Sequence, residues 1–490
     1  MILIWVFDGL RPDLVQPELM PKLSALRERG AWFSQSYCAF PPVTRVNAAT
    51  LASGAAPAKH GIPGNTLFLR DAAEPRFATT GDDAVLRGLR REPDTPLLAV
   101  PTLAETLARH GRRTLAIGTG SPGSAYLLHP EVARVGGAIW HPAFCEPAGL
   151  GKLVEERLGP RSGAEGYTAE ALGARVAYAA RALTDVLMRH VRPALVFFWC
   201  TVPDGLHHRF GLGSPEALAG LKGADAIFGE TVAALEKLAG EPLDLFVTAD
   251  HGYSTVTQHV DVAAALSAAL PERGAADVWA VTVDGGAAHL FARDGKPPDA
   301  KLRGATVKAL LAHDWAGAVF AREQTPGALP LAALGIDCER APDLLMTFAW
   351  SDAPNAFGYH GTSPGGGGIA VGAGDHGGAS PHELRNTLLA AGPSFRSGTL
   401  AGAAGIADIA PTVCRILGIP AAREWNGRVL TEALAEGGEA FAETERGSES
   451  YQLLTAGERE QQVWLSLVQY RGRAYVRAAG RGDVAAAHYD

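Results

Sequence analysis

The sequence contains few cysteines, and their distribution excludes two kinds of small scaffold. The five cysteines are scattered, odd in number and never spaced as a Cys-x-x-Cys pair. This pattern is typical of buried free thiols in a reducing compartment, and it excludes a disulfide framework or a zinc knuckle. The chain also lacks a basic excess, because 44 Lys and Arg stand against 52 Asp and Glu for a net charge of -8. A surface for a nucleic-acid polymer is therefore not expected.

Long hydrophobic runs and a targeting segment are missing as well. No run approaches the ~18 apolar residues that a membrane helix needs, so no membrane partner is expected. The opening stretch, Met1 to Phe7, is too short for a signal peptide and lacks its basic start. We therefore expect a cytoplasmic protein, although a chain trimmed of its leader would look the same. Nothing in the sequence indicates an oligomeric state.

What the sequence does contain is material for a large α/β core. Its 490 residues are 47% hydrophobic and 20% charged, which excludes a disordered chain and suits two or three domains. Short apolar runs without polar alternation indicate buried parallel strands, and helical patterns separate them. The alternation predicts an α/β fold with a central, mostly parallel sheet flanked by helices. The expected strands are Ile2–Phe7, Thr114–Ile117, Leu195–Cys200, Leu243–Thr248 and Leu344–Phe348, and the expected helices are Pro21–Arg29, Thr102–His110, Ala169–His190 and Ala224–Ala239.

Two regions interrupt this alternation and suggest additions to the core. Residues 254–341 contain strand-like and helical pieces of their own, and we expect them to form an inserted cap subdomain. Residues 436–490 turn polar and then offer two alternating segments, Gln462–Tyr470 and Arg473–Ala478. These segments predict a small C-terminal β appendage. The core itself is accordingly expected in two parts, 1–253 and 342–435.

Carboxylate and imidazole side chains collect just after the expected strands and in a later glycine-rich loop. In an open α/β sheet, groups that follow the carboxyl ends of parallel strands meet at one edge. Each such Asp, taken alone, is more often a helix cap or turn former. Their conjunction at one edge predicts a metal site, because mixed oxygen and nitrogen ligands hold zinc and similar ions. The candidate ligands are Asp8, Asp204, His208, Asp250, His251 and His376.

A hydroxyl group that could act as a nucleophile lies at Thr44. A helix is expected to start there, with a first turn that runs from Thr44 to Asn47. The dipole of such a helix favours a developing alkoxide and an approaching anion, and coordination to a metal would activate the oxygen further. The alternative is that Thr44 only caps the helix, as threonine at such a position usually does. Spacing alone leaves both roles open.

Taken as a set, these residues resemble the alkaline phosphatase superfamily, and within it the nucleotide pyrophosphatase/phosphodiesterase branch. That branch shows an Asp after the first strand, a Thr three residues before an Asn, Asp-x-x-x-His, Asp-His-Gly and a late His-Gly. The similarity extends through His60-Gly-Ile-Pro-Gly-Asn65 and Asp408-Ile-Ala-Pro-Thr412. It covers about residues 1–265 and 342–432, and it implies an alkaline-phosphatase-like fold.

The resemblance also implies a two-metal hydrolase that cleaves phosphate diester or pyrophosphate bonds in a small-molecule phosphate ester. Zinc is the expected metal, and manganese suits the same ligands. Thr44 would attack phosphorus and form a covalent phospho-threonine intermediate, while Asn47 would donate to a phosphoryl oxygen. Two neighbouring ions would clamp the attacking and leaving oxygens. The implied ligands are Asp204, His208 and His376 for one ion, and Asp8, Asp250, His251 and the Thr44 oxygen for the other.

Arg45 departs from the branch, whose nucleotide-cleaving members tend to carry an apolar or aromatic residue after the nucleophile. Its guanidinium could bind a second charge on the substrate, or it could point away and lie on the helix surface. This residue keeps two alternatives open, a phosphonate hydrolase and a phosphomonoesterase of the same superfamily. Threonine at position 44 disfavours a sulfatase or a phosphoglycerate mutase, and the complete ligand set disfavours an inactive binding protein. His207, His382 and Asp375 neighbour the ligand positions without matching them.

Overall fold

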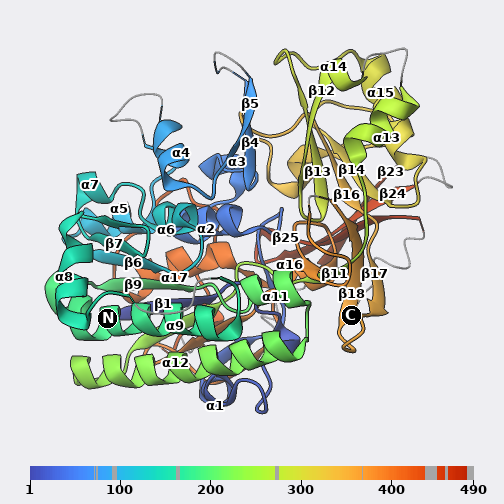
Figure 1. Cartoon of the computed structure of the whole chain (residues 1–490). Helices are drawn as coiled ribbons and strands as arrows, with labels where there is room; N and C mark the ends of the chain where they lie inside the picture. The colour runs from blue at the N-terminus through green and yellow to red at the C-terminus, as the bar shows by residue number, and fades with distance from the viewer. Residues whose placement is uncertain are drawn as a thin grey trace.

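The core of the molecule is a nine-stranded sheet, on the left of Figure 1. The computed structural model describes residues 1–70, 72, 75–90, 96–161, 166–270, 275–366, 368–435, 450–457 and 462–482. The strands lie across the sheet in the order β21 (Gly398–Leu400), β2 (Ala31–Phe33), β20 (Leu388–Ala391), β10 (Asp244–Thr248), β1 (Ile2–Phe7), β9 (Leu195–Cys200), β6 (Thr114–Gly118), β7 (Ala138–His141) and β8 (Phe144–Glu146). The five strands from β10 to β7 are parallel to one another. The expected α/β fold with a mostly parallel central sheet is therefore confirmed.

Helices cover both faces of this sheet, because residues along each buried strand alternate between two apolar sides. In β1, Leu3 and Trp5 point to one face, whereas Ile2 and Ile4 point to the other. The ring of Trp5 stacks on Phe198 of β9, with 4.0 Å between the ring centroids. In the ranges described, no helix is long and apolar enough to cross a membrane. The first face packs against α1 (Pro21–Arg29), α9 (Ala169–Arg181) and α12 (Pro215–Ala239), and the second against α2 (Thr44–Ser53), α5 (Leu103–Ala108), α6 (Pro122–Leu128) and α17 (Ile409–Ile416).

The helices form where the sequence predicts them, although one begins earlier than expected and another contains an irregular turn. The helix expected from Ala224 begins earlier, at Pro215, because the Ser214 side chain accepts a hydrogen bond from Ala217 N and caps the first turn. The helix expected over Ala169–His190 contains a π-helical turn at Ala182–Leu187 before its last turn, α10 (Met188–Val191). Shorter elements on this side are α3 (Pro57–His60), β4 (Thr66–Leu69), β5 (Arg76–Thr79), α4 (Asp83–Gly88), α7 (Val132–Val135) and α8 (Gly149–Leu158).

A second, five-stranded sheet forms the upper right of Figure 1 and corrects one expectation. Leu344–Phe348 was expected in the central parallel sheet, but it forms β16 and pairs antiparallel with β13 and β14 of this second sheet. A short, wholly apolar run indicates a buried strand without indicating which sheet it joins. The limits of core, cap and appendage stay a prediction. The sheet contains β12 (Trp279–Asp284), β13 (Ala287–Ala292), β16, β14 (Ala316–Ala321) and β15 (Leu329–Pro330), with α13 (Val262–Ala269), α14 (Ala275–Val278) and α15 (Ala300–Leu311) beside it.

A small four-stranded sheet joins segments that are far apart in the chain. It contains β17 (Ser351–Pro354), β18 (His360–Gly365), β11 (Ser254–His259) and β19 (Gly374–Asp375). Within it, Ser254 pairs with Asp375 in antiparallel register. This pairing brings the chain just after β10 beside the loop that follows β19, more than a hundred residues later.

The C-terminal segments form the predicted β appendage, a three-stranded antiparallel sheet of β23 (Ser450–Ala456), β24 (Val463–Tyr470) and β25 (Arg473–Arg481). Residues 436–449 and 483–490 of that prediction lie outside the described residues. The sheet is attached to the core by buried polar contacts as well as by apolar packing. The Tyr475 hydroxyl donates to Asp408 Oδ2 over 2.8 Å, and Asp408 also accepts from the backbone of Gly405 and Arg428.

Tyr475→Phe should loosen this attachment, because it removes one donor from a fully buried carboxylate. We expect a loss of about 1–3 kcal/mol in the free energy of unfolding, measured by urea denaturation. Tyr451→Phe is the matched control, since this tyrosine of the same sheet is 50% exposed, and it should change stability by less than about 0.5 kcal/mol. Equal effects of the two variants would contradict the role assigned to the Asp408 contact.

Candidate active site

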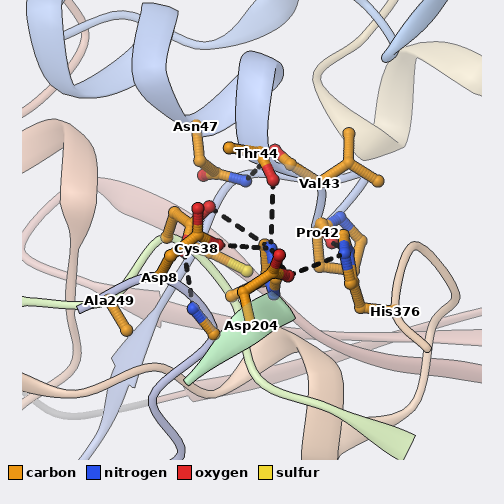
Figure 2. A network of polar contacts seen from close by, with 12 residues as sticks. Asp8, Cys38, Pro42, Val43, Thr44, Asn47, Asp204, Ala249 and His376 are labelled. Carbon is orange, nitrogen blue, oxygen red and sulfur yellow. Dashed lines mark hydrogen bonds and ion pairs between the residues drawn. The ribbon is translucent and has the colours of Figure 1, made fainter. Parts of the chain in front are cut away.

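The predicted ligands meet at the carboxyl edge of the central sheet. Figure 2 labels three of them, Asp8, Asp204 and His376. Asp8 directly follows β1, and the helix after β9, α11 (Asp204–Phe210), carries two of the others. Because Asp204 and His208 are four residues apart, both lie on one face of this helix. The segment after β10 supplies Asp250 and His251, and the β11–β19 pairing brings in His376. The structure therefore brings together all six residues that the sequence singled out.

The six side chains form two adjoining groups of three. In the first group, His208 Nε2 lies 3.4 Å from Asp204 Oδ1 and 3.2 Å from His376 Nε2. In the second, His251 Nε2 lies 3.5 Å from Asp8 Oδ1 and 3.2 Å from Asp250 Oδ2. The two groups touch, because the rings of His251 and His376 stack with 3.5 Å between their centroids.

Each of the three imidazole rings is oriented by a backbone carbonyl. Such a contact makes Nδ1 the protonated nitrogen and leaves the Nε2 lone pair free to bind a cation. All three Nε2 atoms point into the cluster. The Nδ1 contacts are His208 with Gly374 O at 3.0 Å, His376 with Pro42 O at 2.8 Å, and His251 with Gly252 O at 3.0 Å.

Two carboxylates of the cluster, those of Asp8 and Asp250, are buried, and each has one oxygen without a hydrogen-bond partner in the described part of the chain. Among the described residues, none donates a hydrogen bond to Asp8 Oδ1 or Asp250 Oδ2. Burial, followed by the charges of Asp204 and Asp250, raises the pKa of Asp8 well above its usual range. Burial also raises the pKa of Asp250. Orphaned carboxylate oxygens beside three free imidazole lone pairs fit divalent cations.

Thr44 lies at the edge of the second group and does not cap its helix. It is the first residue of α2, and the N-cap position belongs to Val43, which makes no side-chain cap. Thr44 Oγ1 instead lies 3.4 Å from His251 Nε2. The capping role that remained open from the sequence is therefore wrong, and the hydroxyl faces the cluster (Figure 2).

Asn47, the expected phosphoryl donor, has other partners in the structure. Its side chain is fully buried on α2, where Nδ2 donates to Ala39 O and Val43 O and Oδ1 accepts from Ala39 N. These contacts fasten the loop before α2. Asn47 does not line the cavity over the cluster, because its amide points back into this loop (Figure 2).

A cavity of about 660 Å³ opens over the cluster and reveals residues that sequence reasoning missed. Asn65 lines it, and its Oδ1 accepts a hydrogen bond from Arg45 N, which leaves the amide NH₂ available. The segment His60–Asn65 had been noted for its similarity to the family, so a signal for Asn65 was present. Asp375 is the second addition, because its ligand atom lies within 4.8 Å of those of His208 and His376.

A mostly parallel α/β sheet with two Asp/His groups and a helix-terminal hydroxyl at its carboxyl edge defines a class, the metal-dependent hydrolases of the alkaline phosphatase superfamily. The chain belongs to the type I phosphodiesterase/nucleotide pyrophosphatase family, whose model matches residues 2–354. It is thus a hydrolase that acts on phosphate esters, as the resemblance implied. No relative was found among curated protein sequences.

Solved structures confirm the fold. Human ectonucleotide pyrophosphatase/phosphodiesterase 5 superposes with a TM-score of 0.61 at 19% identity, over 89% of this chain and 99% of that one. The murine enzyme gives a TM-score of 0.59 at 18% identity, over 89% and 100%. An inactive murine form with a threonine-to-alanine substitution, in complex with AMP, gives 0.59 at 19% identity, over 89% and 99%.

Asp8→Asn should separate the stability of the metal-free protein from its capacity to bind metal. Without metal, the substitution removes one of several crowded, buried charges, so we expect the melting temperature at pH 8 to rise by a few degrees. With zinc at a hundred times its dissociation constant, the wild type should gain about 2.7 kcal/mol, and the variant far less. Thermal melts with and without zinc measure both effects. The exposed Asp185→Asn should change neither, and a full zinc response in Asp8→Asn would contradict the site.

Proposed function

We propose that this protein is a two-metal phosphodiesterase that cleaves diester or pyrophosphate bonds through a phospho-Thr44 intermediate. The observation that carries the proposal is the position of Thr44 Oγ1, 3.4 Å from His251 Nε2 at the floor of the cavity. A hydroxyl held beside two cation sites is placed to attack a phosphorus atom bound over them. The inactive threonine-to-alanine form of the murine neighbour supports a nucleophilic threonine, and its AMP supports a small-molecule nucleotide substrate.

Two divalent cations, which we propose to be zinc, would supply positive charge that lowers the pKa of the nucleophile and stabilises the leaving oxygen. Each of the two groups of three residues would hold one cation. Asp8, Asp250, His251 and Thr44 Oγ1 would hold one ion. Asp204, His208 and His376 would hold the other, and the hydrogen bond from the Tyr253 hydroxyl to Asp204 Oδ1 orients that carboxylate.

The side chains then perform two displacements at the same phosphorus. Thr44 gives its hydroxyl proton to water, and its Oγ forms a bond to phosphorus while the bond to the ester oxygen opposite it breaks. The departing alkoxide takes a proton from water. A water molecule then attacks the phospho-threonine from the vacated side, which releases the phosphate product and restores the Thr44 hydroxyl.

We assign the phosphoryl-oxygen donor to Asn65 and not to Asn47. The Asn65 amide lines the cavity beside Thr44, and its oxygen is fixed by Arg45 N, so the NH₂ group is presented to a bound phosphoryl group. The Asn47 amide is occupied by the loop before α2. A phosphonate hydrolase or a phosphomonoesterase is the second candidate, and the observation that favours it is Arg45, which lines the cavity.

Thr44→Ala should abolish turnover. With bis-p-nitrophenyl phosphate beside p-nitrophenyl phosphate, we expect the zinc-loaded wild type to prefer the diester and to lose activity on chelation. Thr44→Ala should lower kcat by about 10³-fold or more, because the covalent route is lost, whereas Thr44→Ser should retain activity. Release of p-nitrophenolate measures all three. A preference for the monoester would favour the phosphatase alternative, and activity that survives in Thr44→Ala would exclude the covalent intermediate.

The two asparagines should give opposite kinds of defect. Asn65→Ala should lower kcat/KM for the diester by about 10²-fold, the usual cost of losing one donor to a developing charge, with little change in melting temperature. Asn47→Ala should lower the free energy of unfolding by about 1–3 kcal/mol, because it leaves buried backbone groups unpaired. Initial rates and urea denaturation on both variants check the assignment. The reverse pattern would return the donor role to Asn47.

A further inference from the structure

Arg45 is a part-buried arginine without a partner for its charge. It lines the cavity beside Thr44, and no described residue accepts a hydrogen bond from its buried Nε. The charge of Asp284 acts on Arg45 ahead of those of three carboxylates of the cluster, and no ion pair with any of them is recorded among the described residues. Asp284 is itself engaged elsewhere, since its Oδ2 accepts from the backbone of Asn65 and Thr66 over 2.7 and 3.2 Å. The N–H groups of the guanidinium are therefore available to donate hydrogen bonds to a molecule that enters the cavity.

The guanidinium lies against a turn that supports one wall of the cavity. A β-carbon at Gly81 would stand 3.9 Å from Arg45 Cζ, so the side chain packs along this turn. The Gly81 carbonyl accepts a hydrogen bond from Gly123 N over 2.8 Å. That bond ties the turn to the segment Gly120–Pro122, which lines the cavity.

A second arginine flanks the other end of the same wall. Arg175 of α9 lines the cavity, and the hydrogen bond that the structure records for it is a long one, 3.5 Å from Nη1 to Thr119 O. Between the two arginines the wall adjoins the metal cluster, because a β-carbon at Gly120 would lie 3.9 Å from Asp8 Oδ2.

Several part-buried or buried arginines of this chain are paired with carboxylates, whereas others, such as Arg385, donate to a backbone carbonyl. Arg70 meets Asp343 at 2.6 Å, and Arg90 meets Glu131 at 2.7 Å. No ion pair within 4.0 Å is recorded for Arg45 or Arg175 in the part of the chain that the structure describes. The chain has a net charge of -8, so carboxylates that could pair with arginines are plentiful. Two guanidinium groups without such a partner on one wall of the cavity are suited to bind an anion.

The position of this wall indicates which part of the substrate it meets. In an in-line displacement the leaving oxygen departs opposite Thr44 Oγ. Arg45 follows Thr44 directly, and the wall adjoins Asp8, which belongs to the same group of ligands as Thr44. The substituent that stays on phosphorus is therefore the one within reach. Among the lining residues described, Tyr167 is the one aromatic ring besides histidine, and it is 59% exposed.

We propose that Arg45 and Arg175 bind a second anionic group, a carboxylate or a phosphoryl group, on the substituent that stays on phosphorus. The natural substrate is accordingly a phosphate diester whose retained arm carries its own negative charge. This inference rests on the proposed phosphodiesterase function. It makes Arg45 and Arg175 specificity-determining residues of that reaction.

The test uses two p-nitrophenyl phosphodiesters that differ only in the retained arm, a short alkyl chain ending in a carboxylate or in the matching carboxamide. The readout is the ratio of kcat/KM for carboxylate over carboxamide, so a loss common to both substrates cancels. For the zinc-loaded wild type we expect a ratio of about ten or more, the factor that a charge-assisted hydrogen bond provides. Arg45→Gln and Arg175→Gln should each bring the ratio towards one, and Arg45→Lys should keep part of it.

Arg181→Gln is the matched control, since Arg181 lies on the same helix as Arg175, is exposed, and does not line the cavity. It should leave the ratio unchanged. A wild-type ratio near one, or a high ratio that persists in Arg45→Gln, would overturn the inference while the phosphodiesterase function stands. If Arg45→Gln impairs only p-nitrophenyl phosphate, the second charge is that of the phosphoryl group itself, and the inference is also overturned. Absence of chelator-sensitive turnover with either diester would instead overturn the proposed function.

Discussion

The arrangement of the active site depends on three carboxylates that crowd around one imidazole and have too few hydrogen-bond donors of their own. Asp8, Asp204 and Asp250 all lie within 4.0 Å of His251 Nε2, and two of them keep an oxygen without a hydrogen-bond donor in the described structure. Like charges this close, away from water, oppose folding unless a cation joins them. The fold must therefore supply stability elsewhere, and the apolar layers on both faces of the central sheet do so.

Chain segments of different origin hold these charges in place. The packing around Gly9 is so close that only glycine fits there. Its φ of +73° is favourable only for glycine, and a β-carbon at this position would clash with the ring of Tyr253. This close approach lets Gly9 N donate to Asp250 Oδ1 over 3.0 Å, while the Tyr253 hydroxyl donates to Asp204. The strand ends and the pairing of β11 with β19 thus form one rigid frame. A cation entering this frame meets ligands that need little further ordering.

Much of this site could be predicted from the sequence, because strand ends are visible as apolar runs followed by polar residues. Five of the candidate ligands were predicted in that way, His376 from a glycine-rich loop and Thr44 from the start of a helix, and the structure brings all seven residues together. The position of β16 could not be predicted, since its apolar run carries no information about its partners. The choice of Asn65 over Asn47 as the proposed phosphoryl-oxygen donor also depended on the structure. Asn47 is one helical turn from Thr44, yet its amide bonds to the loop before α2. Asn65 lies 21 residues after Thr44 in the chain, and the hydrogen bond from Arg45 N holds it beside the cavity.

The role proposed for Arg45 would give a metal centre of this common kind a particular specificity. The cations would bind the reacting phosphoryl group of any ester, so they distinguish substrates poorly. Discrimination has to come from groups that contact the rest of the molecule. A part-buried guanidinium discriminates between anionic and neutral groups, because its hydrogen bonds to an anion are stronger than those to a neutral acceptor. Arg45 and Arg175 face the cavity without carboxylate partners, while arginines such as Arg70 are paired. An unpaired charge at this depth costs stability in the empty protein, and that cost is offset when an anionic substrate arrives.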